Sequence, residues 1–281
     1  MIRNFVKIYR KLPFRPFKKL LSDLLRKHQL QNKNRIVISK IDGITYELDL
    51  NELIDSSIYY EGCFEATTTA IINKYIKRGM TVFDIGANIG CHTLHFAKLV
   101  SNEGIVIAFE PMLKAFSKLK RNLELNRFQN IVLEKIALSN TNSGKQPIYF
   151  QSSYPLGKGR EEISKGQKEI VDIITLDEYV RTNKINRIDF IKLDVDGYEY
   201  KVIQGGINSI KKFKPIMIIE FGKYTLKECG DRLEDLIDLL DSLGFSFYSE
   251  RNLRKYESKD SILNAVPSDR TINVLCKLNK I

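Results

Sequence analysis

Short apolar runs alternate with helix-forming stretches over most of the sequence from residue 81 onward. The spacing predicts strands at 81–85, 105–110, 131–137, 188–193 and 216–221, and helices at about 90–101, 112–126, 176–182, 198–212 and 231–243. Strands that are apolar throughout are covered on both faces, so this order predicts a parallel sheet between two layers of helices. Right-handed crossovers bring the carboxyl ends of such strands to one edge, where ligands bind.

Segments outside this alternation predict additions to the sheet. Residues 36–50 form two short strands around Asp42-Gly43, which is a β-hairpin signal, and a helix follows at about 65–78. Residues 143–174 interrupt the alternation with two strands, and the loop at 152–168 between them is either a cover for an acceptor site or a plain connection. The last two strands, FSFY and INVLCKL, fit an antiparallel ending.

The positive charge is concentrated at the start of the chain. The 281 residues carry a formal net charge of +11, and residues 1–35 contribute an excess of ten positive charges. Apolar residues at helical spacing between Phe17 and Leu25 predict a basic amphipathic helix. Such an arm can pack on the domain with its cations in water, lie on an anionic membrane or bind nucleic acid. It has no uninterrupted apolar core, so we expect neither a signal peptide nor a span across a bilayer.

Cysteine and histidine are too few and too scattered for a structural metal site. The four cysteines include no CxxC pair, which argues against zinc and against a disulfide scaffold and fits a reducing, cytoplasmic location. Of three histidines, His92 and His95 share one predicted helix, so we expect them to be structural or to line a cofactor. The hydrophobic content of 43% allows one large domain with an appendage.

The turn after the strand at 81–85 narrows the choice of ligand. Residues 81–93 read TVFDIGANIGCHT, which contains neither the GxGxxG of dinucleotide sites nor the GxxxxGK[ST] of phosphate loops. The pattern DxGxNxG, with an acid one strand later, is typical of enzymes that bind S-adenosylmethionine (SAM). Gly86 and Gly90 allow the backbone to approach the cofactor, and Asp84 suits its positively charged groups. The alternative role of Asp84 is a turn or helix cap.

A second acid, Glu110, ends the next strand. A carboxylate there is placed to accept both ribose hydroxyls, although a solvated strand end is the alternative. Pro111 then starts the following helix. Two acids on consecutive strands with the glycine turn between them favour a cofactor site. We expect adenine at the end of the third strand, near Ala137, Leu138 and Ser139.

Further acids end two later strands. Asp194 follows the strand at 188–193 and Glu220 ends the strand at 216–221, so both are expected at one cleft. Methyl transfer to an alcohol needs in-line placement and removal of a proton, so we predict that Asp194 or Glu220 is the base. Lys192 and Glu199 are predicted to bind or orient the substrate. The pair of acids could also hold a divalent metal, which we do not expect, and Glu199 could simply favour a helix N-terminus.

Six segments, ordered within residues 44–221, carry a family resemblance: FDIGANIGCHTLHFAKLV, AFEP, LKRNLELN, KIALSN, TLDEYV and IDFIKLDVDGYEYKVIQGG. They resemble the FkbM-type family of SAM-dependent methyltransferases. The resemblance implies an α/β, Rossmann-like class I methyltransferase fold with a mostly parallel seven-stranded sheet, an antiparallel last strand and helices on both faces. An N-terminal helical arm and a β-hairpin are added here. The sequence departs from the family at Asp196, where Glu is more common, and at Cys91-His92, which replace aromatic residues.

The resemblance also implies site residues and an activity. Glu65 would close over the cofactor, and the full set predicted to bind SAM is Glu65, Asp84, Gly86, Asn88, Gly90, Thr93, Glu110, Pro111, Ala137 and Ser139. The family methylates hydroxyls, often on sugars of glycans and lipids or on polyketides. We therefore expect a SAM-dependent O-methyltransferase whose acceptor is a glycan or a small molecule.

Two other functions stay open. An RNA methyltransferase could use the arm as a phosphate tether, but residues 194–197 are acidic where amino-methylating RNA enzymes carry an Asn/Asp-Pro-Pro-aromatic motif, so nucleic acid is disfavoured. A non-catalytic SAM-binding, membrane-associated module would predict a damaged cofactor site, yet Asp84, Gly86 and Glu110 are present.

The predicted organisation is an arm at 1–35 followed by a methyltransferase domain at 36–281. Within that domain, 36–64 form the hairpin and lead-in, and 143–174 form a strand-loop-strand insertion. We expect a cytoplasmic protein, and peripheral attachment to the inner face of the membrane through residues 1–35 is left open. The sequence does not predict the oligomeric state.

Overall fold

The structure is a computed structural model that describes residues 36–150 and 167–278. The predicted arm at 1–35 and nearly all of the loop predicted at 152–168 lie outside the described residues. The strands are β1 (Ile36–Ile41), β2 (Ile44–Asp49), β3 (Thr81–Ile85), β4 (Ile105–Phe109), β5 (Ile131–Glu134), β6 (Ile136–Ser139), β7 (Gly144–Phe150), β8 (Gln167–Thr175), β9 (Phe190–Leu193), β10 (Ile216–Phe221), β11 (Phe245–Ser249) and β12 (Ile272–Leu278). The helices are α3 (Leu53–Glu61), α4 (Ala66–Tyr75), α5 (Cys91–Val100), α6 (Leu113–Glu124), α8 (Leu176–Thr182), α9 (Glu199–Gln204), α10 (Ile207–Phe213), α11 (Lys223–Glu228), α12 (Leu233–Ser242) and α13 (Lys259–Ala265).

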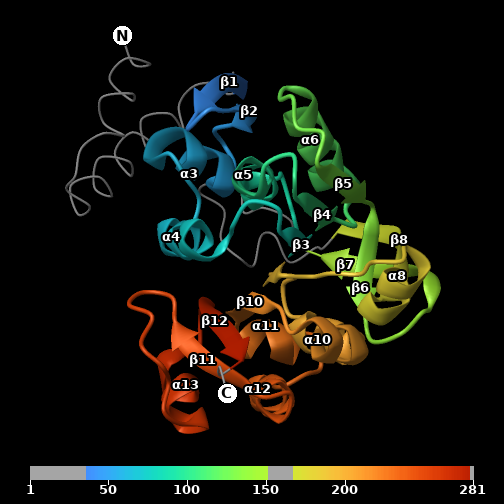
Figure 1. The fold of residues 1–281 in the computed structure, drawn as a ribbon, viewed down its shortest axis with the longest axis vertical. Helices are drawn as coiled ribbons and strands as arrows, with labels where there is room; N and C mark the ends of the chain where they lie inside the picture. Colours follow the sequence, from blue (N-terminus) through green and yellow to red (C-terminus); the bar gives the residue numbers. More distant parts are fainter. Residues whose placement is uncertain (1–35, 151–166, 279–281) are drawn as a thin grey trace.

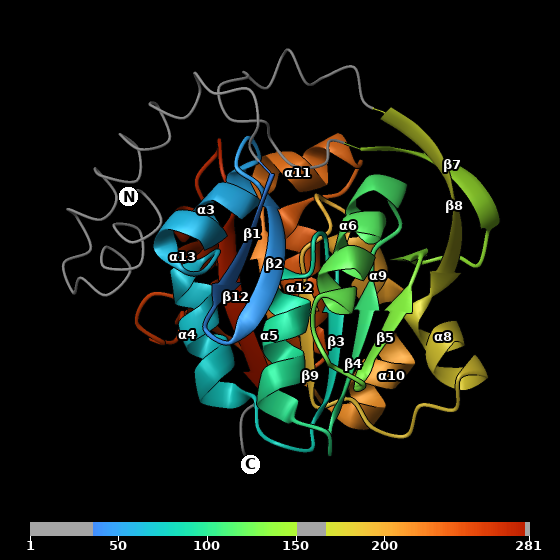
Figure 2. The ribbon, with the colours of Figure 1, turned by 90° about the horizontal axis from the view of Figure 1, so that it is seen from above.

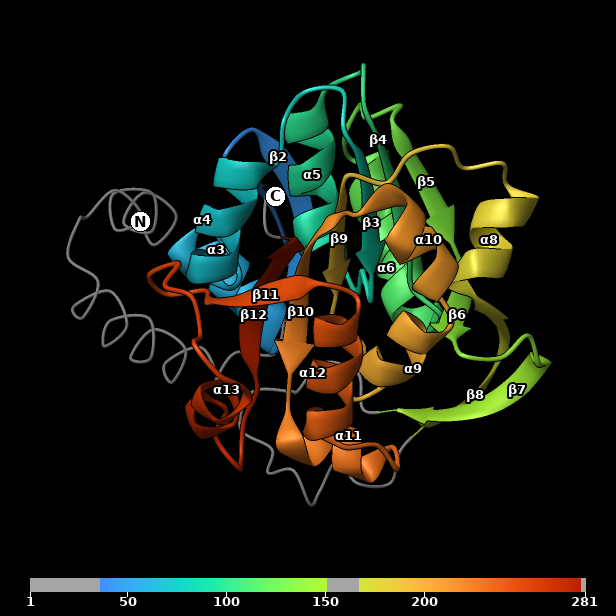
Figure 3. The same cartoon turned by 60° about the horizontal axis from the view of Figure 1, so that its bottom comes forward.

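Seven strands form the central sheet, in the order β11-β12-β10-β9-β3-β4-β5. The strands from β10 to β5 are parallel to one another, whereas β12 runs antiparallel between β10 and β11. Figure 3 shows these strands with α9, α10 and α12 in front of them. The predicted sheet with an antiparallel last strand is confirmed.

Successive residues of a strand point to opposite faces of the sheet. Both faces are covered by apolar clusters. Phe83 of β3 belongs to the core cluster that contains residues of α9, α10 and α12. Val82 and Phe190 belong to the cluster formed with α4 and α5. Asp84 and Lys192 come two residues after Val82 and Phe190 and are register partners across β3 and β9. Both charged side chains therefore lie on the face that α4 and α5 cover.

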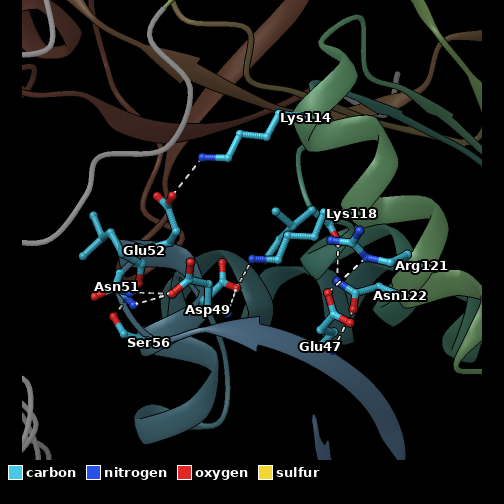
Figure 4. Close-up of polar contacts among 12 residues, drawn as sticks. Glu47, Asp49, Asn51, Glu52, Ser56, Lys114, Lys118, Arg121 and Asn122 are labelled. Carbon is cyan, nitrogen blue, oxygen red and sulfur yellow. Dashed lines mark hydrogen bonds and ion pairs between the residues drawn. The ribbon is translucent and has the colours of Figure 1, made fainter. Parts of the chain in front are cut away.

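A polar seam attaches the β1–β2 hairpin and α3 to α6 (Figure 4). In its most buried ion pair, Lys118 of α6 contacts Asp55 of α3, which is 1% exposed. Asn122 adds hydrogen bonds from the same helix: its side chain accepts from the Glu47 N–H at 2.8 Å and donates to the Ile89 carbonyl at 3.0 Å. The ion pairs of this polar seam are Glu47–Arg121, Glu52–Lys114 and Asp55–Lys118.

A second, three-stranded sheet has the order β6-β8-β7. β8 is parallel to β6 and antiparallel to β7, and Figures 1 and 2 show the sheet beside the β5 edge of the central sheet. The single strand predicted at 131–137 is wrong, because the chain changes partners at Lys135. β5 pairs with β4 in the central sheet, whereas β6 pairs with β8.

The single helix predicted at 198–212 is also wrong, because α9 ends at Gln204 and α10 begins at Ile207. The break is a point of close packing. A Cβ added to Gly205 would lie 2.0 Å from the Ser139 carbonyl oxygen, and one added to Gly206 would lie 2.6 Å from Leu176 Cδ2. Helices α3, α11 and α13 fall where the sequence predicted none.

Candidate active site

A cavity of about 780 Å³ opens at the carboxyl ends of the central strands. Within the described part of the chain, Lys192 is the only lysine or arginine that lines it. Its walls are therefore rich in acid. Seven carboxylate side chains line the cavity: Glu65, Asp84, Glu110, Asp194, Asp196, Glu220 and Glu228.

The glycine turn after β3 packs against the loop that follows β9. Gly86 has a φ of 86°, and a Cβ on it would lie 1.8 Å from the backbone oxygen of Asp194. Gly90 has a φ of 87°, a left-handed conformation that favours glycine, and a Cβ on it would lie 2.4 Å from Leu119 Cδ1. Gly86 lines the cavity and Gly90 does not. Gly86 thus allows the turn after β3 to pack against the loop after β9, a constraint that the sequence analysis did not predict.

Glu110 is held at the end of β4 by backbone donors. Its Oε2 accepts the Asn88 N–H and its Oε1 accepts the Met112 N–H, each at 2.9 Å. The side chain is 5% exposed. Burial raises the pKa of Glu110 to about 7, with the charges of Asp196 and Asp84 adding to the effect and the backbone bonds opposing it. The carboxylate is fixed in place and still faces the cavity.

Asp84 presents one oxygen that no described donor satisfies. The Thr93 hydroxyl donates to its Oδ2 at 2.5 Å, whereas its Oδ1 is buried without a hydrogen-bond partner. Burial raises the pKa of Asp84, and the charge of Lys192 opposes that rise. Thr93 is buried behind Asp84 and does not line the cavity. An unsatisfied carboxylate oxygen beside a cavity is suited to a cationic ligand.

Lys192 is a buried cation shared by several acids. It is 3% exposed and donates to Asp194 Oδ2 at 2.7 Å. Burial alone would lower the pKa of Lys192, but the charges of Asp194, Glu65 and Asp84 raise it. The ammonium therefore stays charged and compensates acids from β3, β9 and the start of α4.

Glu65 precedes α4 in a left-handed conformation, with a φ of 50°. Its Oε2 lies 3.2 Å from His92 Nε2. Burial opposes ionisation, but the hydrogen bond from His92 and the charge of Lys192 outweigh it and lower the pKa of Glu65 to about 2. His95 contacts Asn73 instead, with its Nε2 2.8 Å from the amide oxygen, and does not line this cavity.

Glu199 does not line the cavity, although the sequence analysis placed it with the substrate. It is fully buried, and its Oε1 accepts the N–H groups of Val195 at 2.9 Å and Gly197 at 3.3 Å. Its side chain therefore shapes the loop that carries Asp194 and Asp196. Burial raises the pKa of Glu199 to about 8.

A known family model matches this chain. The model of the FkbM methyltransferase domain covers residues 84–247, which is more than half of the chain. The chain belongs to the FkbM methyltransferase family. The family, the Rossmann-like fold and the SAM-dependent methyltransferase domain predicted from the sequence are thereby confirmed.

Two curated relatives match part of this chain. The hexuronic acid methyltransferase AglP of Haloferax volcanii is 27% identical over 137 residues, which are 49% of this chain and 54% of AglP. Methyltransferase 1 of Beauveria bassiana is 22% identical over 176 residues, which are 55% of this chain and 66% of that protein. The matches therefore span between about half and two thirds of each relative's length.

Solved structures are similar to this chain at low identity. The FkbM methyltransferase of Methylobacillus flagellatus is 16% identical, with a TM-score of 0.47 over 78% of this chain and 49% of that one. A SAM-dependent O-methyltransferase of Thermotoga maritima is 12% identical, with a TM-score of 0.44 over 90% and 82% of the two chains.

The cofactor of an FkbM domain is SAM, as predicted. The residues of this cavity fit such a cofactor, because SAM carries a positively charged sulfonium and amino group and the unpartnered oxygen of Asp84 borders the space. No group of three or more His, Cys, Asp or Glu side chains within 36–150 and 167–278 is arranged to hold a metal ion.

The FkbM cavity also contains residues that the sequence analysis missed. Thr271 and Tyr224 line it and belong to no motif, whereas Tyr198 lies in the segment IDFIKLDVDGYEYKVIQGG but was assigned no role. Thr271 lies next to Glu220 only because β12 pairs with β10, so the signal was in the sheet topology. Of the residues predicted to bind cofactor, all except Gly90 and Thr93 line the cavity, and of those predicted for the acceptor, all except Glu199 do.

Proposed function

We propose that this chain is an O-methyltransferase that transfers the methyl group of SAM to a hydroxyl of a sugar. The proposal depends on one observation: a single cavity contains Asp84 and Glu110 at the ends of β3 and β4, and also Asp194 and Glu220 at the ends of β9 and β10. The first pair suits a cationic cofactor with a ribose, and the second suits removal of a proton from an alcohol. The name of AglP, a hexuronic acid methyltransferase, supports a sugar acceptor.

At the cofactor end, the carboxylate of Glu110 would accept the ribose hydroxyls through the positions not used by Asn88 and Met112. Asp84 and Glu65 would compensate positive charge. Ala137 and Ser139, at the end of β6, would border the adenine. When bound, SAM supplies a methyl group on a positively charged sulfur, which is a strong electrophile.

At the acceptor end, the chain has two tasks. It must place the hydroxyl in line with the methyl group, and it must take the proton as the new bond forms. A positioned carboxylate contributes about 10²–10⁴-fold to such a step. Asp194 and Glu220 both line the cavity and are the candidates for that base. Within the described residues, seven carboxylates and one lysine line the wall, which makes a polyanionic nucleic acid a poor acceptor.

Mass spectrometry of the glycans from a deletion strain tests the proposal. Loss of a methyl group from one sugar residue is expected, with restoration by the wild-type gene but not by a gene carrying Glu110→Ala. Glycans that keep every methyl group while an RNA or a lipid loses one would contradict the sugar acceptor.

We also propose that residues 1–35 attach the protein to anionic membranes. The support is their excess of ten positive charges and helical spacing of apolar residues. None of the helices between residues 36 and 150 or between 167 and 278 is long and apolar enough to cross a bilayer. Sedimentation with vesicles of anionic or neutral lipid would compare the full chain with a full-length variant in which Lys18, Lys19, Arg26 and Lys27 are glutamine. Equal sedimentation would count against attachment, and the division at residue 35 stays a prediction.

A further inference from the structure

Asp194 and Glu220 are neighbours across the sheet. Ile219 of β10 pairs with Leu193 of β9, so the next residue of each strand is Glu220 and Asp194. Both line the cavity, and both lie on the same face of the sheet as Lys192. Position alone therefore does not decide which of the two takes a proton, and the difference has to come from their partners.

Asp194 forms an ion pair with Lys192. The lysine ammonium donates to its Oδ2 at 2.7 Å, and the lysine is 3% exposed. Protonation of that carboxylate would leave the buried lysine without its closest counterion. The Oδ2 atom of Asp194 is thus occupied by the contact with the lysine ammonium.

Glu220 has a hydroxyl for a partner instead of a cation. The Thr271 hydroxyl donates to its Oε1 at 2.6 Å, and within the described residues Glu220 forms no ion pair. Burial raises the pKa of Glu220 well above its usual value, and the charges of Asp194, Glu199 and Asp196 raise it further. The hydrogen bond from Thr271 acts in the opposite direction, because it favours the charged carboxylate.

High proton affinity suits a base, provided that the group is ionised when the acceptor is bound. A positive charge brought into the cavity lowers the pKa of a nearby carboxyl. Lys192 lies on the neighbouring strand but is already shared by Asp194, Asp84 and Glu65. Ionisation of Glu220 would therefore depend on the cationic ligand, which would couple cofactor binding to readiness for proton removal.

We propose that Glu220 is the catalytic base, that Thr271 positions its carboxylate, and that Asp194 serves to hold Lys192. The inference rests on the O-methyltransferase function proposed above. The acceptor oxygen forms a bond to the methyl carbon, and the carbon–sulfur bond breaks with its electron pair remaining on sulfur. The hydroxyl proton passes to Glu220.

Transfer of labelled methyl groups from SAM to glycans extracted from the source organism tests the assignment. Glu220→Gln is expected to lower the transfer rate by about 10²–10⁴-fold while SAM still binds in calorimetry. Asp238→Asn, which changes an exposed acid of α12 paired with Lys259, is the matched control and should leave the rate unchanged. Loss of transfer in Asp194→Asn together with full transfer in Glu220→Gln would overturn the assignment.

The pH profile separates a positioning role of Thr271 from a merely structural one. Thr271→Val removes a bond that favours the carboxylate, so the acidic limb of the profile should move to higher pH, and Thr271→Ser should restore it. Asp194→Asn removes a charge that raises the pKa of Glu220, so its acidic limb should move to lower pH. Unmoved limbs in both variants would overturn the inference.

If the chain is not a sugar O-methyltransferase, the result differs from that of a wrong base assignment. In that case the wild-type chain binds SAM but labels no glycan, or labels another class of molecule. The state of Glu220 can still be measured, because carbon-13 NMR of the chain bound to S-adenosylhomocysteine follows its titration without an acceptor. Titration of Glu220 in the usual range of a glutamate, near about 4, would overturn the inference whatever the acceptor.

Discussion

The polar seam and the cavity both gather acidic side chains, but they balance the charge differently. In the polar seam each acid has a cation of its own: Lys114 for Glu52, Lys118 for Asp55 and an arginine for the third. In the cavity, Asp194 and two other acids share Lys192, while Glu110 and Glu220 have no ion pair within the described residues.

This difference distinguishes acids that are paired within the chain from acids that a bound ligand can compensate. In the polar seam the charge of each acid is balanced by its own cation, although one oxygen of Glu52 and one of Asp55 are buried without a hydrogen-bond partner. Acids that share one cation in a buried space hold electrostatic free energy that a cationic ligand can release. Burial raises the pKa of Glu110 to about 7 and also raises the pKa of Glu220, and neither acid has an ion pair within the described residues. Burial raises the pKa of Asp55 in the polar seam too, but there the charge of Lys118 opposes the rise. If the charge imbalance belongs to the cavity alone, variants of cavity residues should respond differently from variants in the polar seam.

Removing the shared cation should have the largest effect. Lys192→Met leaves Asp194, Asp84 and Glu65 without their common counterion, and removal of one partner from a buried charge network costs about 3–5 kcal/mol. Urea unfolding near neutral pH measures this as a lower free energy of unfolding. A loss below about 1 kcal/mol, as for an exposed ion pair, would contradict the role of Lys192.

The same variant has a pH signature. Without Lys192 the buried acids have raised folded-state pKa values, and such acids destabilise the fold at pH values above their unfolded pKa of about 4. The deficit should therefore shrink as the pH falls toward that value. A deficit that grows in acid would mean that the acids were not compensated by Lys192.

The next largest effect is expected on the affinity for SAM when Glu110 is replaced. Glu110→Ala removes a carboxylate whose charge-assisted hydrogen bonds are worth about 1.5–3 kcal/mol each, so the dissociation constant for SAM should rise by about 100-fold. Calorimetry measures it, with Glu47→Gln in the polar seam as the matched control. If Glu110→Ala bound SAM as tightly as the wild type, Glu110 could not be the ribose ligand.

The position of the cavity acids was predictable from sequence. Asp84, Glu110 and Asp194 were placed correctly at one edge because parallel topology sends every strand end there. Charge balance was not predictable in the same way. The pairing of Glu65 with His92 depends on a left-handed residue at the start of α4, and no periodicity encodes that conformation.

The errors have physical reasons as well. Glu199 directly follows a loop with positive φ at Asp196 and Gly197, and that local reversal directs its carboxylate back to the loop's N–H groups. The strand at 131–137 and the helix at 198–212 were each continuous in pattern. They were divided by tertiary contacts, of which the approach of Gly205 to Ser139 is one.

Protonation of Glu110 should give a smaller, graded effect on SAM affinity. Its pKa of about 7 means that the carboxylate is ionised above neutrality and binds a proton below it. Ribose hydroxyls donate to the charged form, so affinity should fall by up to about tenfold for each pH unit below 7. Calorimetry in buffers of different ionisation enthalpy would detect the released proton. In Glu110→Gln this component should vanish, and its persistence would assign it to another acid.

The smallest effect is expected in the polar seam. Lys114→Met breaks the pair with Glu52, but Lys114 is 67% exposed, so solvent screens the interaction and the free energy of unfolding should fall by less than about 1 kcal/mol. SAM affinity should not change, because Lys114 does not line the cavity. Both quantities can be measured on one preparation by urea unfolding and calorimetry. A clear loss of SAM affinity in Lys114→Met would show that the polar seam and the cavity are coupled through α6. The ion pairs of the polar seam would then affect ligand binding as well as stability.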